Sequence, residues 1–118
     1  PDPVVLEFAK TYGDKFQLTS DCAQAAAGAD VVFTDVWASM GEEAQIPERV
    51  RLLSPFRVTE ETLKATENPD VLYLHCLPSF HDFETKTAKT WMDKGIDIRE
   101  VTDDNRYTNH ALAIELPE

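Results

Sequence analysis

The sequence predicts an α/β fold, with three layers in which helices cover both faces of a mostly parallel sheet. Two apolar runs of strand length, residues 30–36 and 71–76, alternate with helix-like segments of about ten residues. Such alternation is typical of βαβ units, whose strands lie parallel to one another. In open sheets of this kind, ligands bind beyond the carboxyl ends of the strands, so the residues that follow each run are the first candidates for a site.

The first part of the chain is expected to begin with a helix. Asp2 followed by proline is typical of a helix N-terminus. Residues 15–19 alternate in the manner of a strand, and Ser20 or Asp21 can cap a brief second helix. The β-branched run at residues 30–36 is most simply a strand buried on both faces.

The middle of the chain begins with a segment that has no periodicity. Residues 37–47 are therefore expected to form a long loop, and such loops are often functional. Pro47 can begin a helix that must end before Pro55, and Thr59 can cap another. Residues 71–76 follow turn chemistry and form a second buried strand.

The last part of the chain is expected to add a helix, a strand and a final helix. Asp82 can cap a helix over residues 84–94, residues 96–101 read as a strand, and residues 105–116 as a helix. The sequence has no internal repeat, low-complexity tract or long linker. We therefore expect a single domain over residues 1–118.

Composition narrows the classes of partner. The chain has 22 acidic and 11 basic residues and a formal net charge of −11, which disfavours nucleic acids and anionic membranes. No apolar run approaches the roughly 18 residues of a membrane span, and no signal peptide is recognisable. Cys22 and Cys76 lie far apart, which favours reduced thiols. We expect a soluble, cytoplasmic chain with no nucleic-acid or membrane partner.

The first candidate site motif is TDVWASMG, residues 34–41. Asp35 ends the first strand, and Ser39, Met40 and Gly41 follow in the loop. A zwitterionic amino acid suits this set, because the carboxylate can pair with an ammonium while the hydroxyl and free backbone amides bind a carboxylate. The same spacing fits equally well a turn capped by Asp35, with Met40 filling a gap in the core.

The second candidate motif is HCLP, residues 75–78. A thiol beside an imidazole can serve as a nucleophile, as a hydrogen-bond partner for a reacting amine, or as a metal ligand. Adjacent strand residues point to opposite faces, so His75 and Cys76 are not expected to form a dyad. A cysteine in a buried strand is also more often plain core. His75, Cys76 and His81 lack a recognised ligand spacing, so no metal site is expected.

Taken together, TDVWASMGEE, HCLPSFHDFET and the later EVTD resemble the ornithine-binding half of the ornithine carbamoyltransferases. These enzymes transfer a carbamoyl group from carbamoyl phosphate to the side-chain amine of ornithine. The resemblance runs to about residue 104, and the SMG tripeptide resembles the ornithine enzymes rather than those that accept aspartate or putrescine. It implies a Rossmann-like domain and an acceptor site for ornithine.

The resemblance also implies roles for single residues. Asp35 would bind the α-ammonium of ornithine, Ser39 and Met40 would hold its α-carboxylate, and Cys76 would lie beside the reacting δ-amine. The implied chemistry needs a neutral amine and a polarised carbamoyl carbonyl, and much of its rate comes from positioning and electrostatic stabilisation. No organic cofactor and no metal is implied.

Three further groups would serve the carbamoyl donor. The resemblance implies that His75 and the backbone carbonyl of Leu77 contact the carbamoyl group. Arg106, in DNR, matches the arginine of the family's late ENR motif, which meets carbamoyl phosphate. The family's N-terminal domain with its STRTR phosphate-binding motif is absent from these residues. Carbamoyl phosphate is therefore expected to bind only when a complementary domain is present.

The sheet is expected to be incomplete relative to the family. The family's first strand and helix of this domain are missing, and the passage after EVTD lacks the usual HTIK continuation. Three interpretations remain open: an excised or engineered fragment, a natural truncated relative that binds or self-associates, or one piece of a catalytic assembly. We favour a fragment that is inactive alone, because catalysis requires two domains to close over both substrates. Exposed sheet edges would favour homo-oligomers.

Overall fold

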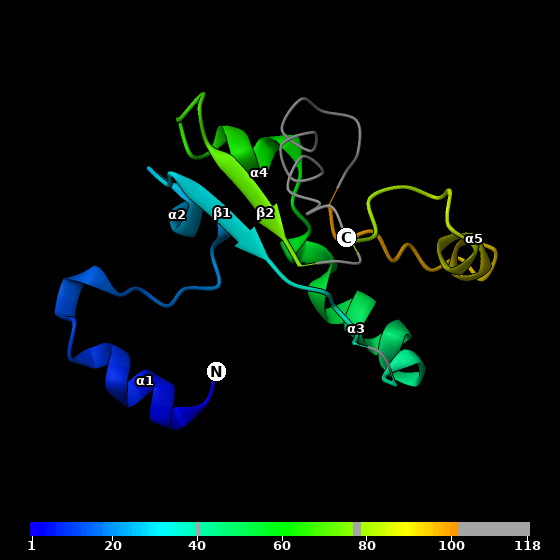
Figure 1. Cartoon of the computed structure of the whole chain (residues 1–118), viewed down its shortest axis with the longest axis horizontal. Helices are drawn as coiled ribbons and strands as arrows, with labels where there is room; N and C mark the ends of the chain where they lie inside the picture. Colours follow the sequence, from blue (N-terminus) through cyan, green and yellow to red (C-terminus); the bar gives the residue numbers. More distant parts are fainter. Residues whose placement is uncertain (40, 77–78, 102–118) are drawn as a thin grey trace, which may run out of the picture.

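The structure is a computed structural model that describes residues 1–39, 41–76 and 79–101. Within these ranges the chain forms α-helices, strands and short 3-10 helices, and Figure 1 shows α1 standing apart from the sheet. The α-helices are α1 (Pro3–Lys10), α2 (Cys22–Ala26), α3 (Ile46–Leu53), α4 (Glu60–Lys64) and α5 (Lys86–Met92). The 3-10 helices are η1 (Gly13–Lys15), η2 (Glu43–Gln45) and η3 (Ser54–Phe56). The final helix expected at residues 105–116 lies outside the described residues.

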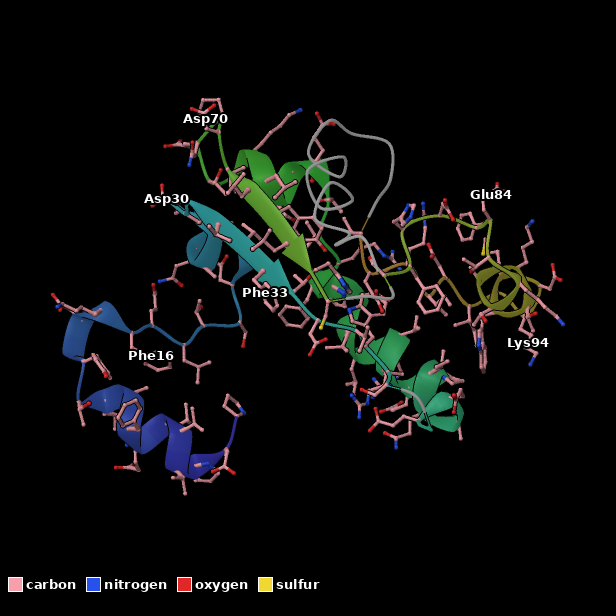
Figure 2. The ribbon with its side chains drawn as sticks, viewed as in Figure 1. Phe16, Asp30, Phe33, Asp70, Glu84 and Lys94 are labelled. Atoms are coloured by element: carbon pink, nitrogen blue, oxygen red, sulfur yellow. The ribbon has the colours of Figure 1, made fainter. Side chains whose placement is uncertain are left out.

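A small parallel sheet organises the described residues. Strands β1 (Val31–Thr34) and β2 (Leu72–His75) pair in register, first residue with first and last with last. Figure 2 shows Asp30 and Asp70 at the end where both strands begin, so the residues after the strands share the opposite end. The α/β class with a parallel sheet is confirmed, and with two strands among the described residues the sheet is incomplete, as expected.

Three helix starts expected from the sequence are confirmed. Asp2 accepts a hydrogen bond from the Val4 amide at 2.8 Å, and Asp21 rather than Ser20 accepts one from the Gln24 amide at 3.0 Å. Thr59 begins α4 with a reciprocal capping box. Each cap satisfies a backbone N–H that has no partner within its helix, which is why short polar side chains mark these positions.

The start of α5 differs from the expectation. Asp82 does not cap the helix but accepts a hydrogen bond from the Glu84 amide at 2.9 Å, which closes a turn before it. Thr85 takes the capping position instead and accepts from the Ala88 amide at 3.1 Å. Both residues have short polar side chains that can bond nearby amides, so the cap predicted from the sequence lies three positions before the observed one.

Two expected strands are absent from the described residues. Residues 15–19 continue from η1 into backbone that is extended at Phe16 but has no strand beside it. Residues 96–101 make a single parallel bridge, between Val58 and Val101. The Arg57 guanidinium donates to the carbonyls of this segment, at Arg99 and Asp97, at 2.7 and 3.0 Å. A side chain thus takes the carbonyls that a neighbouring strand would otherwise bond.

The buried apolar residues form two clusters. One surrounds β2 and consists of Val58, Leu63, Val71, Tyr73 and Val101. The other lies between α3 and α5 and consists of Ile46, Ala88 and Ile98 with partly buried neighbours. The expectation of a fully buried first strand is wrong, since Val31 and Phe33 of β1 are 47% and 63% exposed. The second run is buried only in part, since Val71 and Tyr73 are fully buried but Leu72 is 47% exposed. No helix among the described residues is long and apolar enough to cross a bilayer.

Candidate functional site

The two candidate motifs meet where the strands end. Asp35 directly follows β1 and Cys76 directly follows β2, and the Cys76 amide donates to the Thr34 carbonyl at 3.3 Å. Parallel pairing therefore brings both side chains to the same edge of the sheet, as expected for a ligand site in this fold class. Asp35 and Cys76 are exposed there, whereas the nearby His75 side chain is buried.

The thiol of Cys76 is held in its neutral form. The charge of the Asp35 carboxylate, its hydrogen bond with the thiol and partial desolvation all raise the pKa of Cys76. The nucleophilic form of cysteine is the thiolate, so this environment disfavours the nucleophile among the roles that the sequence left open. It favours a neutral thiol that exchanges hydrogen bonds with a neighbouring group.

His75 is engaged on both ring nitrogens. Its Nε2 lies 3.1 Å from Oε2 of Glu100, without the alignment of a regular hydrogen bond, and its Nδ1 faces the backbone carbonyl of Cys76. Burial lowers the pKa of His75, but the Glu100 carboxylate, the Cys76 carbonyl and the Asp35 charge outweigh it, and the net shift is upward. The imidazole and the Cys76 thiol thus have different partners and form no dyad.

Glu100 is a site residue that the sequence reasoning missed. Its side chain is 3% exposed, and its two carboxylate oxygens accept hydrogen bonds from the amides of Trp37 and Phe80 at 3.2 and 3.1 Å. A signal was present in the sequence, because in an extended segment Glu100 shares one face with the apolar Ile98, which is also buried. A carboxylate on a buried face requires partners that satisfy it.

In the loop after β1, backbone amides donate hydrogen bonds to carboxylates of the same loop. The Ser39 amide donates to Oε2 of Glu42 at 2.9 Å, and the Gly41 amide donates to Oε1 of Glu43 at 3.2 Å. The sequence predicted that these amides would be free to bind a ligand carboxylate, and that expectation is wrong for this conformation. The physical reason is that two neighbouring carboxylates already satisfy the donors. A ligand carboxylate would have to displace them.

Cavities of different sizes lie near the site among the described residues. A cavity of about 20 Å³ lies between the loop and α3, large enough for roughly one water molecule. Its lining residues are Trp37, Ala38, Ile46, Arg49, Val50, Phe80, Ile98 and Glu100. A larger cavity of about 270 Å³ lies along β1, and its lining includes Phe33 and Thr34.

Three of the candidate residues lie outside the described part of the chain: Met40, Leu77 and Arg106. Within the described part, no group of three or more His, Cys, Asp and Glu side chains is arranged to hold a metal ion. Of the candidate residues in the described part, Asp35, Ser39 and Cys76 are exposed, whereas the side chain of His75 is buried together with that of Glu100.

Comparison with known proteins gives a consistent result. The family model described as the Asp/Orn binding domain of aspartate/ornithine carbamoyltransferase matches residues 1–114. The catabolic ornithine carbamoyltransferase of Clostridium perfringens strain 13 is 46% identical over 124 residues, covering 100% of this chain and 38% of the relative. The catabolic enzyme of Bacillus cereus ATCC 14579 is 43% identical over 119 residues, covering 100% and 36%.

Solved structures agree with these relatives. The anabolic ornithine carbamoyltransferase of Campylobacter jejuni superposes with a TM-score of 0.70 and 29% identity, over 96% of this chain and 33% of that one. The ornithine carbamoyltransferase of Pyrococcus furiosus gives 0.65 and 34%, over 94% and 31%. This chain therefore spans little more than a third of the length of the curated relatives that it matches.

Proposed function

We propose that this chain, which belongs to the Asp/Orn-binding domain family of the aspartate/ornithine carbamoyltransferases, forms the ornithine-binding part of a carbamoyl-transfer site. The complete reaction converts carbamoyl phosphate and ornithine to citrulline and phosphate. The observation that carries the proposal is the meeting of Asp35 and Cys76 at the carboxyl ends of two paired parallel strands. Both groups are exposed at the edge where this fold class binds ligands.

The α-amino acid end of ornithine would bind to the loop after β1. The exposed Asp35 carboxylate pairs with the α-ammonium, a charge-assisted contact that is stronger than one between neutral groups. Ser39 and Met40 hold the α-carboxylate. For that step the Ser39 and Gly41 amides must exchange the carboxylates of Glu42 and Glu43 for that of the ligand.

Cys76 would lie beside the reacting δ-amine. Because its pKa is raised, the thiol stays neutral and its sulfur accepts a hydrogen bond from the amine without adding a second negative charge beside Asp35. A second anion at this point would favour the ammonium form of ornithine, which has no lone pair for attack. The neutral thiol therefore suits a site that must hold a neutral amine.

The carbamoyl group would meet His75 and the Leu77 backbone carbonyl. Contact with His75 requires its Nδ1 to leave the backbone carbonyl of Cys76, since the imidazole is 2% exposed in this conformation. The raised pKa of His75 favours an imidazolium, whose positive charge polarises a carbonyl oxygen. This step depends on carbamoyl phosphate being present on the neighbouring side of the site.

Carbamoyl phosphate itself would be bound by Arg106 together with a complementary domain. A net charge of −11 disfavours the capture of a phosphate by this chain alone. We therefore propose that the isolated chain binds ornithine weakly and forms no citrulline. Turnover would require a phosphate-binding partner that closes over both substrates.

Calorimetric titration with ornithine tests this function. Saturable binding is expected in the unmodified chain and should be lost in Asp35→Asn, because the ammonium would lose its charged partner. The matched control is Asp30→Asn, at the other end of β1, which should leave binding unchanged (Figure 2). If no binding occurs, or if both variants weaken it equally, the assignment of the site is wrong.

A second function, self-association as a non-catalytic α/β domain, is favoured by one observation. Val31 and Phe33 expose apolar side chains on β1, and an exposed apolar surface of this kind can be covered by a second copy of the chain. Size-exclusion chromatography with light scattering would show a dimer at high concentration that Phe33→Lys dissociates. A strictly monomeric chain would rule this alternative out.

A further inference from the structure

We propose that Glu100 is a positioning residue of this site, because its buried carboxylate holds the imidazole of His75 and fixes the segments that follow both strands. Glu100 belongs to a third segment of the chain, which carries none of the proposed ligand groups. Its effect on ornithine affinity rests on the proposed function, whereas its effect on His75 does not.

The contacts of Glu100 join three segments. One carboxylate oxygen accepts from the Trp37 amide at 3.2 Å, and the other accepts from the Phe80 amide at 3.1 Å and faces His75 Nε2 at 3.1 Å. The backbone of Glu100 adds two bonds, donating to the Phe80 carbonyl at 2.9 Å and accepting from the Val58 amide at 3.0 Å. A single residue therefore ties the segment after β1 to the segment after β2.

The contacts of Glu100 with its neighbours are hard to replace, because both His75 and Glu100 are buried. The side chains of His75 and Glu100 are 2% and 3% exposed, so neither group can exchange its partner for water. A carboxylate at such depth destabilises the fold unless hydrogen bonds and an opposite charge satisfy it. The Trp37 amide, the Phe80 amide and the His75 imidazole thus supply the hydrogen bonds and the opposite charge that the buried Glu100 carboxylate needs. Asp35 lies two residues before Trp37 and Cys76 directly after His75, so their placement follows from it.

The other titratable groups that face His75 support the same arrangement. Asp35 raises the pKa of His75 through its charge, and the neighbouring Cys76 thiol is neutral because its own pKa is raised. Tyr73, whose ring lies 6.4 Å from the imidazole, has a pKa raised to about 12 by burial, so it stays uncharged. Glu100 is the anion closest to the imidazole among these groups, and it stabilises the imidazolium.

The test is an NMR titration of the His75 imidazole in the unmodified chain and in Glu100→Gln. The variant keeps the shape of the side chain and removes its charge. We expect the pKa of His75 to fall by roughly one unit or more, and ornithine binding to weaken several-fold. Glu84→Gln, in which the altered side chain is 85% exposed, is the matched control and should change neither quantity.

A measurement on the unmodified chain keeps the proposal falsifiable if Glu100→Gln does not fold. The amide signals of Trp37 and Phe80 should shift with pH at the same midpoint as the His75 imidazole, because all three share the Glu100 carboxylate. Independent midpoints would overturn the proposal. So would an unchanged pKa of His75 in a folded Glu100→Gln.

The outcome for Glu100 can be separated from the outcome for the proposed function. If the unmodified chain does not bind ornithine while the pKa of His75 still falls in Glu100→Gln, the function fails and the positioning of His75 stands. If ornithine binds and Glu100→Gln alters neither affinity nor the pKa of His75, the function stands and the role of Glu100 is refuted.

Discussion

The two strands of the sheet pair residue for residue, yet their surroundings differ. Val31 of β1 and its partner Leu72 of β2 are both 47% exposed, but Phe33 of β1 is 63% exposed whereas Tyr73 of β2 is fully buried. At the carboxyl ends, the side chain of His75, the last residue of β2, is 2% exposed, whereas Asp35 and Cys76, which directly follow β1 and β2, are both exposed. An apolar run thus specifies a strand, but its neighbours decide burial. In this site the residues that directly follow both strands are available to a ligand, whereas the last residue of β2 is held by the protein.

The largest expected effect is on stability, when a buried side chain of β2 and an exposed side chain of β1 are each truncated. Tyr73→Ala should lower the free energy of unfolding by about 3–5 kcal/mol, because it leaves a cavity and removes a 2.6 Å hydrogen bond with Thr34. Phe33→Ala, on the exposed strand, should cost about 0.5 kcal/mol or less. Urea denaturation measures both. Equal losses would mean that β1 and β2 are buried alike in solution.

If Tyr73→Ala does not fold, Tyr73→Phe gives a milder form of the same comparison. It removes only the hydroxyl, and a loss of about 1 kcal/mol is expected. A neutral outcome would show that the contact between Tyr73 and Thr34 does not form in solution.

A smaller effect should appear in the pH dependence of stability. The pKa of His75 in the folded chain is raised above its ordinary value of 6.5. Its contribution is therefore fully present below the unfolded pKa and is lost as pH rises through the folded pKa. Thermal unfolding between pH 5.5 and 8.5 should show this decline, and Glu100→Gln should reduce it. A decline of the same size in Glu100→Gln would assign the effect to other groups.

A substitution in the loop after β1 should strengthen ligand binding rather than weaken it. Glu42→Gln should strengthen ornithine binding a few-fold, because an uncharged side chain competes less well with the ligand carboxylate for the Ser39 amide. Calorimetry would measure the change. Glu61→Gln, at an exposed helical position, is the control. Weaker binding in Glu42→Gln would mean that Glu42 supports the bound loop rather than competing with the ligand.

The smallest expected effect concerns the Cys76 thiol. Asp35→Asn removes the charge that raises the pKa of Cys76, so alkylation of the thiol at pH 7.5 should become a few-fold faster. Cys22→Ser in both proteins removes the other thiol. An unchanged rate would place Asp35 and Cys76 farther apart in solution than the structure does.

Local features were predictable from the sequence. The caps Asp2, Asp21 and Thr59 bond amides two or three residues away, so the sequence alone contains both partners. The meeting of Asp35 with Cys76 was predictable for another reason, since parallel strands bring their carboxyl ends to one edge.

The remaining features depend on contacts between distant residues. The Trp37 amide and the Glu100 carboxylate are separated by 63 positions, and no local pattern pairs them. The strand expected at residues 96–101 does not form for a similar reason. Two of its carbonyls accept hydrogen bonds from the Arg57 guanidinium, which lies 40 and 42 positions away in the sequence. The hydrogen bonds from the loop amides to Glu42 and Glu43 are local, yet the sequence did not predict them, because acidic residues in a loop are usually solvated.

Heteronuclear NMR of the unmodified chain during an ornithine titration tests the central claim most directly. The account predicts saturable shifts confined to residues near 35–41 and 75–78, with the signal of Asp30 at the far end of the sheet unchanged. Well-dispersed spectra with no shift in either segment, at millimolar ornithine, would contradict it and leave a folded domain without an acceptor site.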